Sequence, residues 1–493
     1  MSMEQQVGQV EDLEALPQPI GEYRPIDVWQ DHVNHLFYRL RGNELRQFYQ
    51  TFASADYRLA HALADDYYDK VVKRDASLLK RGPGSGASNA APRPPDASTL
   101  TIMEWGPGNG NLAACFLSRL KTLDREGLVY RRVRYLMVDS HPETLESAKQ
   151  HPDLAAHRDR IQTLCGDAQQ LQGVKEGAVD RIICTELWND LPTKLLVKKG
   201  GDVEEEHMRP NLSEDKAAAV PNWSEFVQAF DARNAEGLKK FPHFFDDLIW
   251  EKEYHKVEWK DVPYRKTISE FLRSIDEQVL VPVNLGAFAT IKEAKRLLAP
   301  NAIGFSSFDA GTSDMKVLND PEKPCYGQFG GQYSFMINFL LAEGVAKHLG
   351  VSSIVLELQR EFVGSRLSTN VMTLMDVLAC QPQVGSMAQP WELDRLTIRT
   401  IQALNGTYES PYERQLDFPL REEAPPHECH ELQQTLRSLK RNGLPDTVAY
   451  LTEGEIVRAQ KDLEPLGYDR ESILMALGAP AGPVEYYHFF FRP

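Results

Sequence analysis

The fold class of this chain can be inferred from one stretch, Thr99-Leu-Thr-Ile-Met-Glu-Trp-Gly-Pro-Gly-Asn-Gly-Asn-Leu-Ala113. An apolar run breaks into glycines and then resumes as an amphipathic helix, which is typical of a strand, a turn and a helix. Gly106, Gly108 and Gly110 let the backbone turn sharply and approach a ligand, because they carry no Cβ atom. The amides that open the helix offer hydrogen-bond donors, and Glu104 adds a carboxylate at the strand end. The stretch therefore predicts a loop that binds a nucleotide-like ligand.

Two cofactors fit this loop. Gly108, Gly110 and Ala113 satisfy the G-x-G-x-x-G/A pattern of dinucleotide-binding enzymes, which leaves an NAD-dependent oxidoreductase as an alternative. The string Glu104-x-Gly106-x-Gly108-x-Gly110 instead resembles the class I S-adenosylmethionine (SAM) methyltransferases, which have a Rossmann-like fold. In that resemblance the carboxylate serves the charged amino-acid end of SAM. Beside a pyrophosphate the same carboxylate would cause repulsion, so SAM is the expected cofactor.

Acidic residues also follow the next two predicted strands. The run Val133-Arg-Tyr-Leu-Met-Val-Asp139 places Asp139 at a strand end, where open α/β sheets contact ligands and where its carboxylate can accept both ribose hydroxyls. A helix near Pro142 and a strand over Arg160–Cys165 lead to Gly166-Asp167-Ala168, which resembles the family's contact to the adenine amino group. Each acid alone could be a helix cap or turn residue. Together they predict one cofactor site, formed by Glu104, Gly106, Gly108, Gly110, Asp139, Asp167 and Ala168.

A fourth predicted strand, residues 178–184, runs directly into Thr185-Glu-Leu-Trp-Asn-Asp-Leu-Pro192. In a methyltransferase this loop faces the transferred methyl group. It resembles the Asn-Glu-x-x-Asp-Ala-Leu-Pro loop of the MidA-type methyltransferases, whose mitochondrial members methylate an arginine of a respiratory complex I subunit and assist its assembly. Glu186, Leu191 and Pro192 match that loop, whereas Thr185 and Asn189 depart from it.

The resemblance continues in patches to residue 363. Leu297–Gly311 resembles the family's fifth strand, which ends in Asp-Tyr-Gly; Asp309 matches and Ala310 departs. A later element has Met336 where the family has a histidine, which removes one candidate proton acceptor.

The N-terminus is atypical of the family, whose N-terminal signature is not recognisable before Gly82. Only Phe52–Arg58, followed by a helical stretch to Lys73, could stand for its SAM-covering segment. The resemblance therefore implies SAM binding more directly than it implies an arginine substrate.

Four regions are expected along the chain: a helical N-terminal cap (1–80), a flexible Gly- and Pro-rich linker (81–98), a SAM-binding α/β domain with helices on both faces of its sheet (99–363), and a mainly helical C-terminal region (364–493). The aromatic insertion 193–279 either walls a pocket for a guanidinium or amine or packs as an aromatic-cored helical unit. The last residues, 484–492, favour β-structure and predict a returning strand or a docking peptide.

Composition restricts the partners. The formal net charge of −16 argues against a sequence-independent nucleic-acid binder and favours a basic protein substrate. No apolar run approaches the roughly 20 residues that span a bilayer, and a secretory or transit signal is missing, so a cytoplasmic protein without a membrane partner is expected. The cluster His427-Glu-Cys-His430 has no second ligand pair, so no metal is expected.

Methyl transfer to nitrogen or oxygen is an in-line displacement, so the protein must align donor and acceptor and exclude water. A carboxylate near the methyl group can orient a guanidinium or amine and accept its proton. Glu186 is the main candidate, with Asn189 and Asp190 nearby and Asp309 in support; its alternative role is to cap a helix. We expect methylation of a protein side-chain nitrogen such as arginine. A small-molecule N- or O-methyltransferase and a non-catalytic SAM-fold assembly or binding protein are the alternatives.

Overall fold

The computed structural model describes residues 17–41, 51–80, 99–387, 389–414, 416, 418–420 and 424–493. The predicted linker 81–98 lies outside these described residues, as do residues 1–16 of the predicted cap. Within the described ranges, no helix combines the length and the apolar character needed to cross a membrane.

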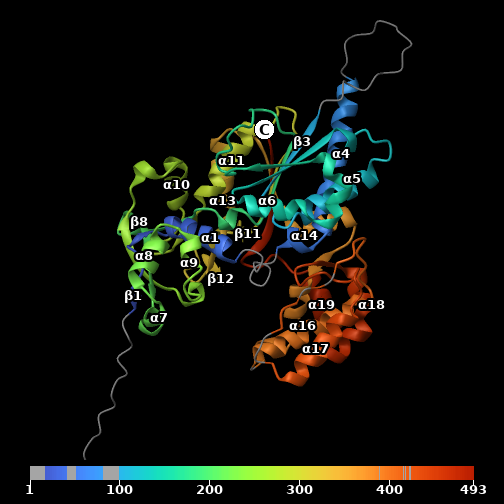
Figure 1. Cartoon of the computed structure of the whole chain (residues 1–493). Coiled ribbons are helices and arrows are strands. Elements are labelled where there is room, and N and C mark those ends of the chain that lie inside the picture. Colours follow the sequence, from blue (N-terminus) through green and yellow to red (C-terminus); the bar gives the residue numbers. More distant parts are fainter. Residues whose placement is uncertain are drawn as a thin grey trace, which may run out of the picture.

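A mostly parallel sheet forms the centre of the molecule, in the order β15-β18-β11-β6-β3-β4-β5 (Figure 1). Strand β18 runs antiparallel to both of its neighbours, whereas the β11, β6, β3, β4 and β5 pairings are parallel. The expected Rossmann-like α/β fold is confirmed. The strands are β3 (Leu100–Trp105), β4 (Val133–Asp139), β5 (Ile161–Cys165), β6 (Arg181–Thr185), β11 (Gly304–Thr312), β15 (Ser353–Leu358) and β18 (Glu485–Arg492), and β14 (Ile337–Asn338) pairs with β11.

Helices cover both faces of this sheet because its strands bury side chains on both sides. In β3, Leu100 and Ile102 pack in one hydrophobic cluster and Met103 and Trp105 in another. The first cluster includes residues of α4 (Arg58–Lys80), α5 (Asn111–Leu123), α6 (Pro142–Lys149) and α14 (Gln359–Leu367). The second includes residues of α10 (Arg265–Leu272), α11 (Leu285–Leu297) and α13 (Phe339–His348).

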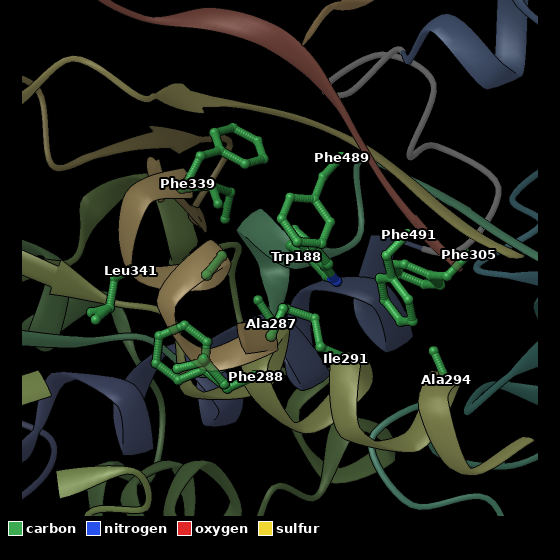
Figure 2. Packing of buried hydrophobic residues seen from close by; sticks show 14 of the residues in the cluster. Trp188, Ala287, Phe288, Ile291, Ala294, Phe305, Phe339, Leu341, Phe489 and Phe491 are labelled. Atoms are coloured by element: carbon green, nitrogen blue, oxygen red, sulfur yellow. The ribbon is translucent and has the colours of Figure 1, made fainter. Parts of the chain in front are cut away.

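The second cluster anchors the loop that follows β6. Trp188 lies fully buried between the sheet and α11, as Figure 2 shows. Its ring stacks on Phe305 at 5.9 Å and contacts Phe489 at 5.4 Å, and its indole N–H donates to the hydroxyl of Thr290 at 2.7 Å. The residues on either side of Trp188 are therefore held at fixed positions at the carboxyl edge of the sheet.

The final strand corrects the predicted domain boundary. β18 lies between β11 and β15, so residues 485–492 form part of the central sheet although the sequence placed them in the C-terminal region. Of the two interpretations of this segment, the structure shows the returning strand. The polypeptide between β15 and β18 is thus a long excursion from one sheet.

The insertion contains an antiparallel sheet, which the helical interpretation did not anticipate. Strands β7 (Lys194–Lys199), β8 (Asp202–Leu212) and β9 (Ile249–Lys256) pair in it, joined by β1 (Gln18–Pro19), β2 (Arg24–Pro25) and β10 (Val281–Val283). Its short helices are α7 (Glu214–Ala219), α8 (Trp223–Asp231) and α9 (Ala235–Leu238). Buried Phe226, Phe230, Phe244 and Phe245 pack there against Trp29 and Phe37 of α1 (Ile26–Arg41). Most of the insertion's buried aromatic residues therefore build a core of their own.

The predicted N-terminal cap consists of two parts with different neighbours. α1 packs on the insertion, whereas α3 (Phe52–Ala55) and α4 pack on the central domain. A short hairpin, β12 (Tyr326–Phe329) and β13 (Gln332–Phe335), contributes Tyr333 and Phe335 to the cluster with α1. The parts of this region that can cover the predicted SAM site are therefore α3 and the end of α1.

The C-terminal module is mainly helical and has its own hydrophobic cluster. It contains α15 (Leu374–Ala379), α16 (Pro390–Asn405), α17 (Pro426–Ser438), α18 (Glu453–Leu463) and α19 (Arg470–Leu477), with a ribbon of β16 (Val371–Thr373) and β17 (Tyr450–Thr452). A buried ion pair joins the module to α4, since Arg58 lies 2.6 Å from Glu455.

We expect Gly110→Ala to destabilise the protein much more than Gly108→Ala. Both glycines have a left-handed backbone, which costs an L-residue about 1–2 kcal/mol. A Cβ at Gly110 would also lie 2.5 Å from the carbonyl oxygen of Ala148, whereas one at Gly108 meets no atom within 4 Å. Overpacking adds about 1–3 kcal/mol at Gly110 alone. Urea denaturation measures both losses, and equal losses would contradict this account of the loop.

Candidate functional site

The glycine loop between β3 and α5 has the geometry of a ligand cradle. Gly106, Gly108 and Gly110 all have positive φ, of 70°, 51° and 80°. The space in front of Gly108 is open, so a ligand can approach the backbone there. Gly110 is the N-cap of α5, so the first amides of that helix point toward the same region.

Helix α3 lies directly against this loop. The Asn109 amide donates to the carbonyl of Ser54 at 2.9 Å, and the Asn111 amide donates to the carbonyl of Ala53 at 2.8 Å. The segment that resembles the family's SAM-covering element therefore contacts the glycine loop, through backbone carbonyls that the sequence pattern does not show.

Glu104 is buried beneath the loop. Its Oε2 accepts a hydrogen bond from the hydroxyl of Tyr135 at 2.9 Å, and burial raises the pKa of its carboxyl to about 7. Its Oε1 is also buried and has no hydrogen-bond partner among the described residues. An unpaired buried acceptor is costly unless a donor fills its place, and the ammonium group of SAM is a donor of the right charge. The residues present thus fit the cofactor at this position.

Asp139 and Asp167 lie at the ends of the two neighbouring strands. The turns after β3, β4 and β5 are joined by backbone bonds, since Gly106 N–H donates to Val138 and Gly166 N–H to Asp139, both at 2.9 Å. The Asp139 carboxylate accepts from the amide of His141 at 2.8 Å. All three predicted strand ends therefore lie at one edge of the sheet.

Asp167 differs from the other two acids because it is exposed. Its carboxylate accepts from the amide of Gln169 at 2.8 Å, which is the turn-stabilising role that a lone acid can have. Ala168 is half-buried and packs against the core cluster. The structure thus brings Asp167 to the correct strand end but leaves its side chain bonded within its own turn.

Glu186 has the most constrained position in the loop after β6. Its φ of 50° lies in the left-handed region, where a residue other than glycine is held only by its surroundings. Its Oε1 accepts from the backbone N–H of Phe52 at 2.8 Å, and its Oε2 accepts from the hydroxyl of Tyr486 at 3.3 Å. Burial raises the pKa of its carboxyl to about 8, and the charge of Asp309 adds to that rise. Glu186 therefore does not cap the turn that follows it, and its carboxylate instead accepts from the first N–H of α3.

Asp309 holds the next residues of the same loop. Its two carboxylate oxygens accept from the backbone N–H groups of Trp188 at 3.2 Å and Asn189 at 3.3 Å. Burial raises its pKa to about 7. The Oδ1 atom of Asn189 is buried and has no hydrogen-bond partner within the described ranges. Asp309 thus positions the loop, and Asn189 leaves an acceptor available.

Asp190 completes a group of acids with Glu186 and Asp309. Its carboxylate accepts from the hydroxyl of Tyr38 and from the amide of Gln332 at 2.5 Å, and burial raises its pKa to about 7. Asp309 accepts from the backbone N–H groups of Trp188 and Asn189, which lie between Glu186 and Asp190 in the chain, so the three carboxyls are gathered around one loop. The charges of Asp190 and Asp309 both raise the pKa of Glu186.

Sequence reasoning missed three polar residues that bond this acidic group: Tyr38, Gln332 and Tyr486. They come from α1, β13 and β18, which are far from Glu186 in the sequence. A tyrosine in an aromatic run such as Tyr486 gives no signal of its own, because the same pattern serves a core strand. Only the pairing of β18 with β11 places it beside Glu186.

Two other sequence features have structural roles. Met336, which replaces the family's histidine, is buried in the core cluster on the α11 side of the sheet. The cluster on α17 does not gather ligands: His430 contacts Gln434 at 2.9 Å, and in the part of the chain that the structure describes no three His, Cys, Asp or Glu side chains form a metal-binding group.

Comparison with known proteins agrees with the loop geometry. Residues 88–303 match the sequence model of a family described as "Putative S-adenosyl-L-methionine-dependent methyltransferase". The curated proteins give no match.

Several solved structures are similar to the chain. One is a likely methyl transferase from Burkholderia thailandensis bound to S-adenosyl-homocysteine. It has 14% sequence identity and a TM-score of 0.46, and the match covers 77% of this chain and 84% of that chain. An uncharacterized protein from the same organism has 16% sequence identity and a TM-score of 0.38, and the match covers 77% of this chain and 90% of that chain. A phosphoethanolamine N-methyltransferase 2 of Haemonchus contortus has 9% sequence identity and a TM-score of 0.27, and the match covers 85% of this chain and 52% of that chain.

The family match covers the glycine loop, the ends of β3, β4 and β5, and the loop that carries Glu186. It favours SAM over a dinucleotide as the cofactor, in agreement with the unpaired oxygen of Glu104. The matched residues, 88–303, therefore indicate a SAM-dependent methyltransferase.

Proposed function

We propose that the enzyme methylates a side-chain nitrogen of a basic protein, with arginine as the acceptor. The observation that carries this proposal is a group of three carboxyls beside the glycine loop, in which Glu186 and Asp309 are buried and Asp190 is half-buried. Such a concentration of acid is costly without a cation. A guanidinium would relieve this cost, and the net charge of −16 would attract a basic substrate.

The cofactor site proposed here consists of the glycine loop and the strand ends. Glu104 would hold the ammonium group through its unpaired oxygen, and Asp139 would accept from the ribose. We keep Asp167 and Ala168 as the adenine contact, which requires Asp167 to exchange its bond to Gln169 for a bond to the base. SAM, when bound, supplies a methyl group for in-line displacement at the acceptor nitrogen.

The residues of the β6 loop would orient the acceptor and take its proton. Glu186, as the carboxylate, would accept the proton that the nitrogen loses, while Asn189 offers its unpaired oxygen to a guanidinium N–H. Asp309 acts through the loop backbone and is therefore a positioning residue. Asp190, fixed by Tyr38 and Gln332, adds negative charge nearby.

The resemblance of the loop to MidA-type enzymes also supports an arginine acceptor, although Thr185, Asn189 and Met336 depart from that family. The test is transfer of labelled methyl from SAM to cell lysate, followed by mass spectrometry of the product. Methylarginine in a protein supports the proposal. A labelled small molecule would show the alternative N- or O-methyltransferase, and SAM binding without any product would show a non-catalytic assembly protein.

We expect Glu186→Gln to remove turnover while SAM binding is retained. The amide still accepts from Phe52 N–H but takes up no proton, and a general base is worth about 10²–10⁴-fold in rate. Calorimetry with SAM and single-turnover methyl transfer separate the two properties. Tyr486→Phe, which removes one hydrogen bond to the same carboxyl, should cost less. Full activity of Glu186→Gln would rule out its role as proton acceptor.

The contribution of Glu186 to the stability of the protein should fall as pH rises from about 5 to 8. The folded-state pKa of Glu186 is about 8, above the ordinary glutamate value, so the folded state keeps a proton that the unfolded chain releases. This contribution to the free energy of unfolding is therefore highest below the unfolded pKa and decreases toward pH 8. Urea denaturation should show a weaker pH dependence in Glu186→Gln than in the wild type. Glu258→Gln, at an exposed position, is the control and should keep the wild-type slope.

A further inference from the structure

A polar cavity lies apart from the candidate site, on the face of the sheet that α4 and α14 cover. Its volume is about 330 Å³, and it lies between α4, α14, β15 and β18. Asp66 and Lys70 line it from α4, Arg366 lines it from α14, and Arg492 lines it from β18. The rings of Phe362 and Phe490 form apolar parts of the wall.

The cations around this cavity outnumber the acids. The single carboxylate of Asp66 faces three of them, with Arg366 at 2.6 Å, Lys70 at 2.8 Å and Arg181 at 3.6 Å. The other acid in the wall, Glu357, contacts His488 at 2.9 Å. Among the described residues Arg492 has no carboxylate partner. Asp69 also contacts Arg366, at 3.2 Å. Three carboxylates (Asp66, Asp69 and Glu357) thus face four cations (Lys70, Arg181, Arg366 and Arg492), which leaves an excess of one positive charge around the cavity.

The buried guanidinium of Arg181 is also an incompletely paired positive charge. Its side chain is 0% exposed and stacks on the ring of Phe490 at 5.2 Å. Its Nη2 donates to Ser306 at 2.7 Å, but its Nε and Nη1 have no hydrogen-bond partner in the described part of the chain. Burial, with the nearby charge of Arg181, lowers the pKa of Lys70 to about 8. A buried, incompletely paired cation is costly unless a counter-charge is supplied.

We propose that this cavity binds the phosphate group of a small molecule. A phosphate accepts hydrogen bonds from several directions, which suits an ammonium on α4, a guanidinium on α14 and a guanidinium at the end of β18. The hydroxyls of Ser353 and Ser365 in the wall add neutral donors. The apolar surface of Phe362 and Phe490 suits the organic part of a phosphomonoester. The ligand neutralises the positive charge that Asp66, Asp69 and Glu357 leave in excess.

The test is isothermal titration calorimetry of the full chain with inorganic phosphate and with glycerol phosphate, at constant ionic strength in chloride. Wild-type protein should bind either probe at one site. Lys70→Gln and Arg492→Gln should each weaken binding by about tenfold, the effect of losing one charged hydrogen bond. Arg492→Gln breaks no ion pair of the described residues, so it should fold normally. Arg360→Gln removes a charge from α14 outside this cavity and should bind as the wild type.

The two probes distinguish the source of the phosphate. Tighter binding of glycerol phosphate assigns the cavity to an organic phosphate, and equal affinity assigns it to the free ion. An absence of binding heat in the wild type, or undiminished affinity in both Lys70→Gln and Arg492→Gln, overturns the proposal. SAM binding should be unchanged in all variants, so failure here leaves the methyltransferase assignment unaffected.

Discussion

The hydrogen bonds of the Glu186 carboxyl determine how this site is assembled. One oxygen accepts from Phe52, near the start of the described chain, and the other from Tyr486, near its end. The left-handed backbone of Glu186 is strained and is kept in place by these contacts and by the buried Trp188. The loop after β6 therefore takes its shape only when α3 and β18 are both docked. The conformation of this candidate site thus depends on the strand that returns after the C-terminal module as well as on the strands before it.

Local sequence was sufficient to predict which strand ends meet at one edge of the sheet, whereas the roles of their acids stay predictions. Each of β3, β4 and β5 brings its acid to the carboxyl edge, because neighbouring parallel strands end at the same edge of a sheet. The burial of Glu104 and the exposure of Asp167 could not be predicted, because both depend on which side of the turn each side chain occupies. Tyr135, the partner of Glu104, reads from sequence as an ordinary core residue.

The remaining parts of the fold and of the candidate site depend on contacts between segments that are distant in the sequence. The aromatic residues of the insertion suggested helices around a core or a substrate wall, but the sheet of β7, β8 and β9 pairs with strands before α1, which no local pattern indicates. The boundary at residue 364 failed for the same reason, since β18 joins a sheet that was otherwise complete more than a hundred residues earlier. Tyr486 reaches Glu186 through the pairing of β18, whereas Tyr38 and Gln332 reach Asp190 from α1 and β13.

The central claim is that SAM lies across the ends of β3, β4 and β5 with its sulfur toward Glu186. A crystal structure of the protein with S-adenosylhomocysteine tests it most directly. The account predicts the ligand's ammonium group on the Oε1 atom of Glu104, its ribose on Asp139, and its sulfur facing the loop that carries Glu186. A nucleoside bound elsewhere, with Glu104 still bonded to Tyr135 alone, would contradict the account.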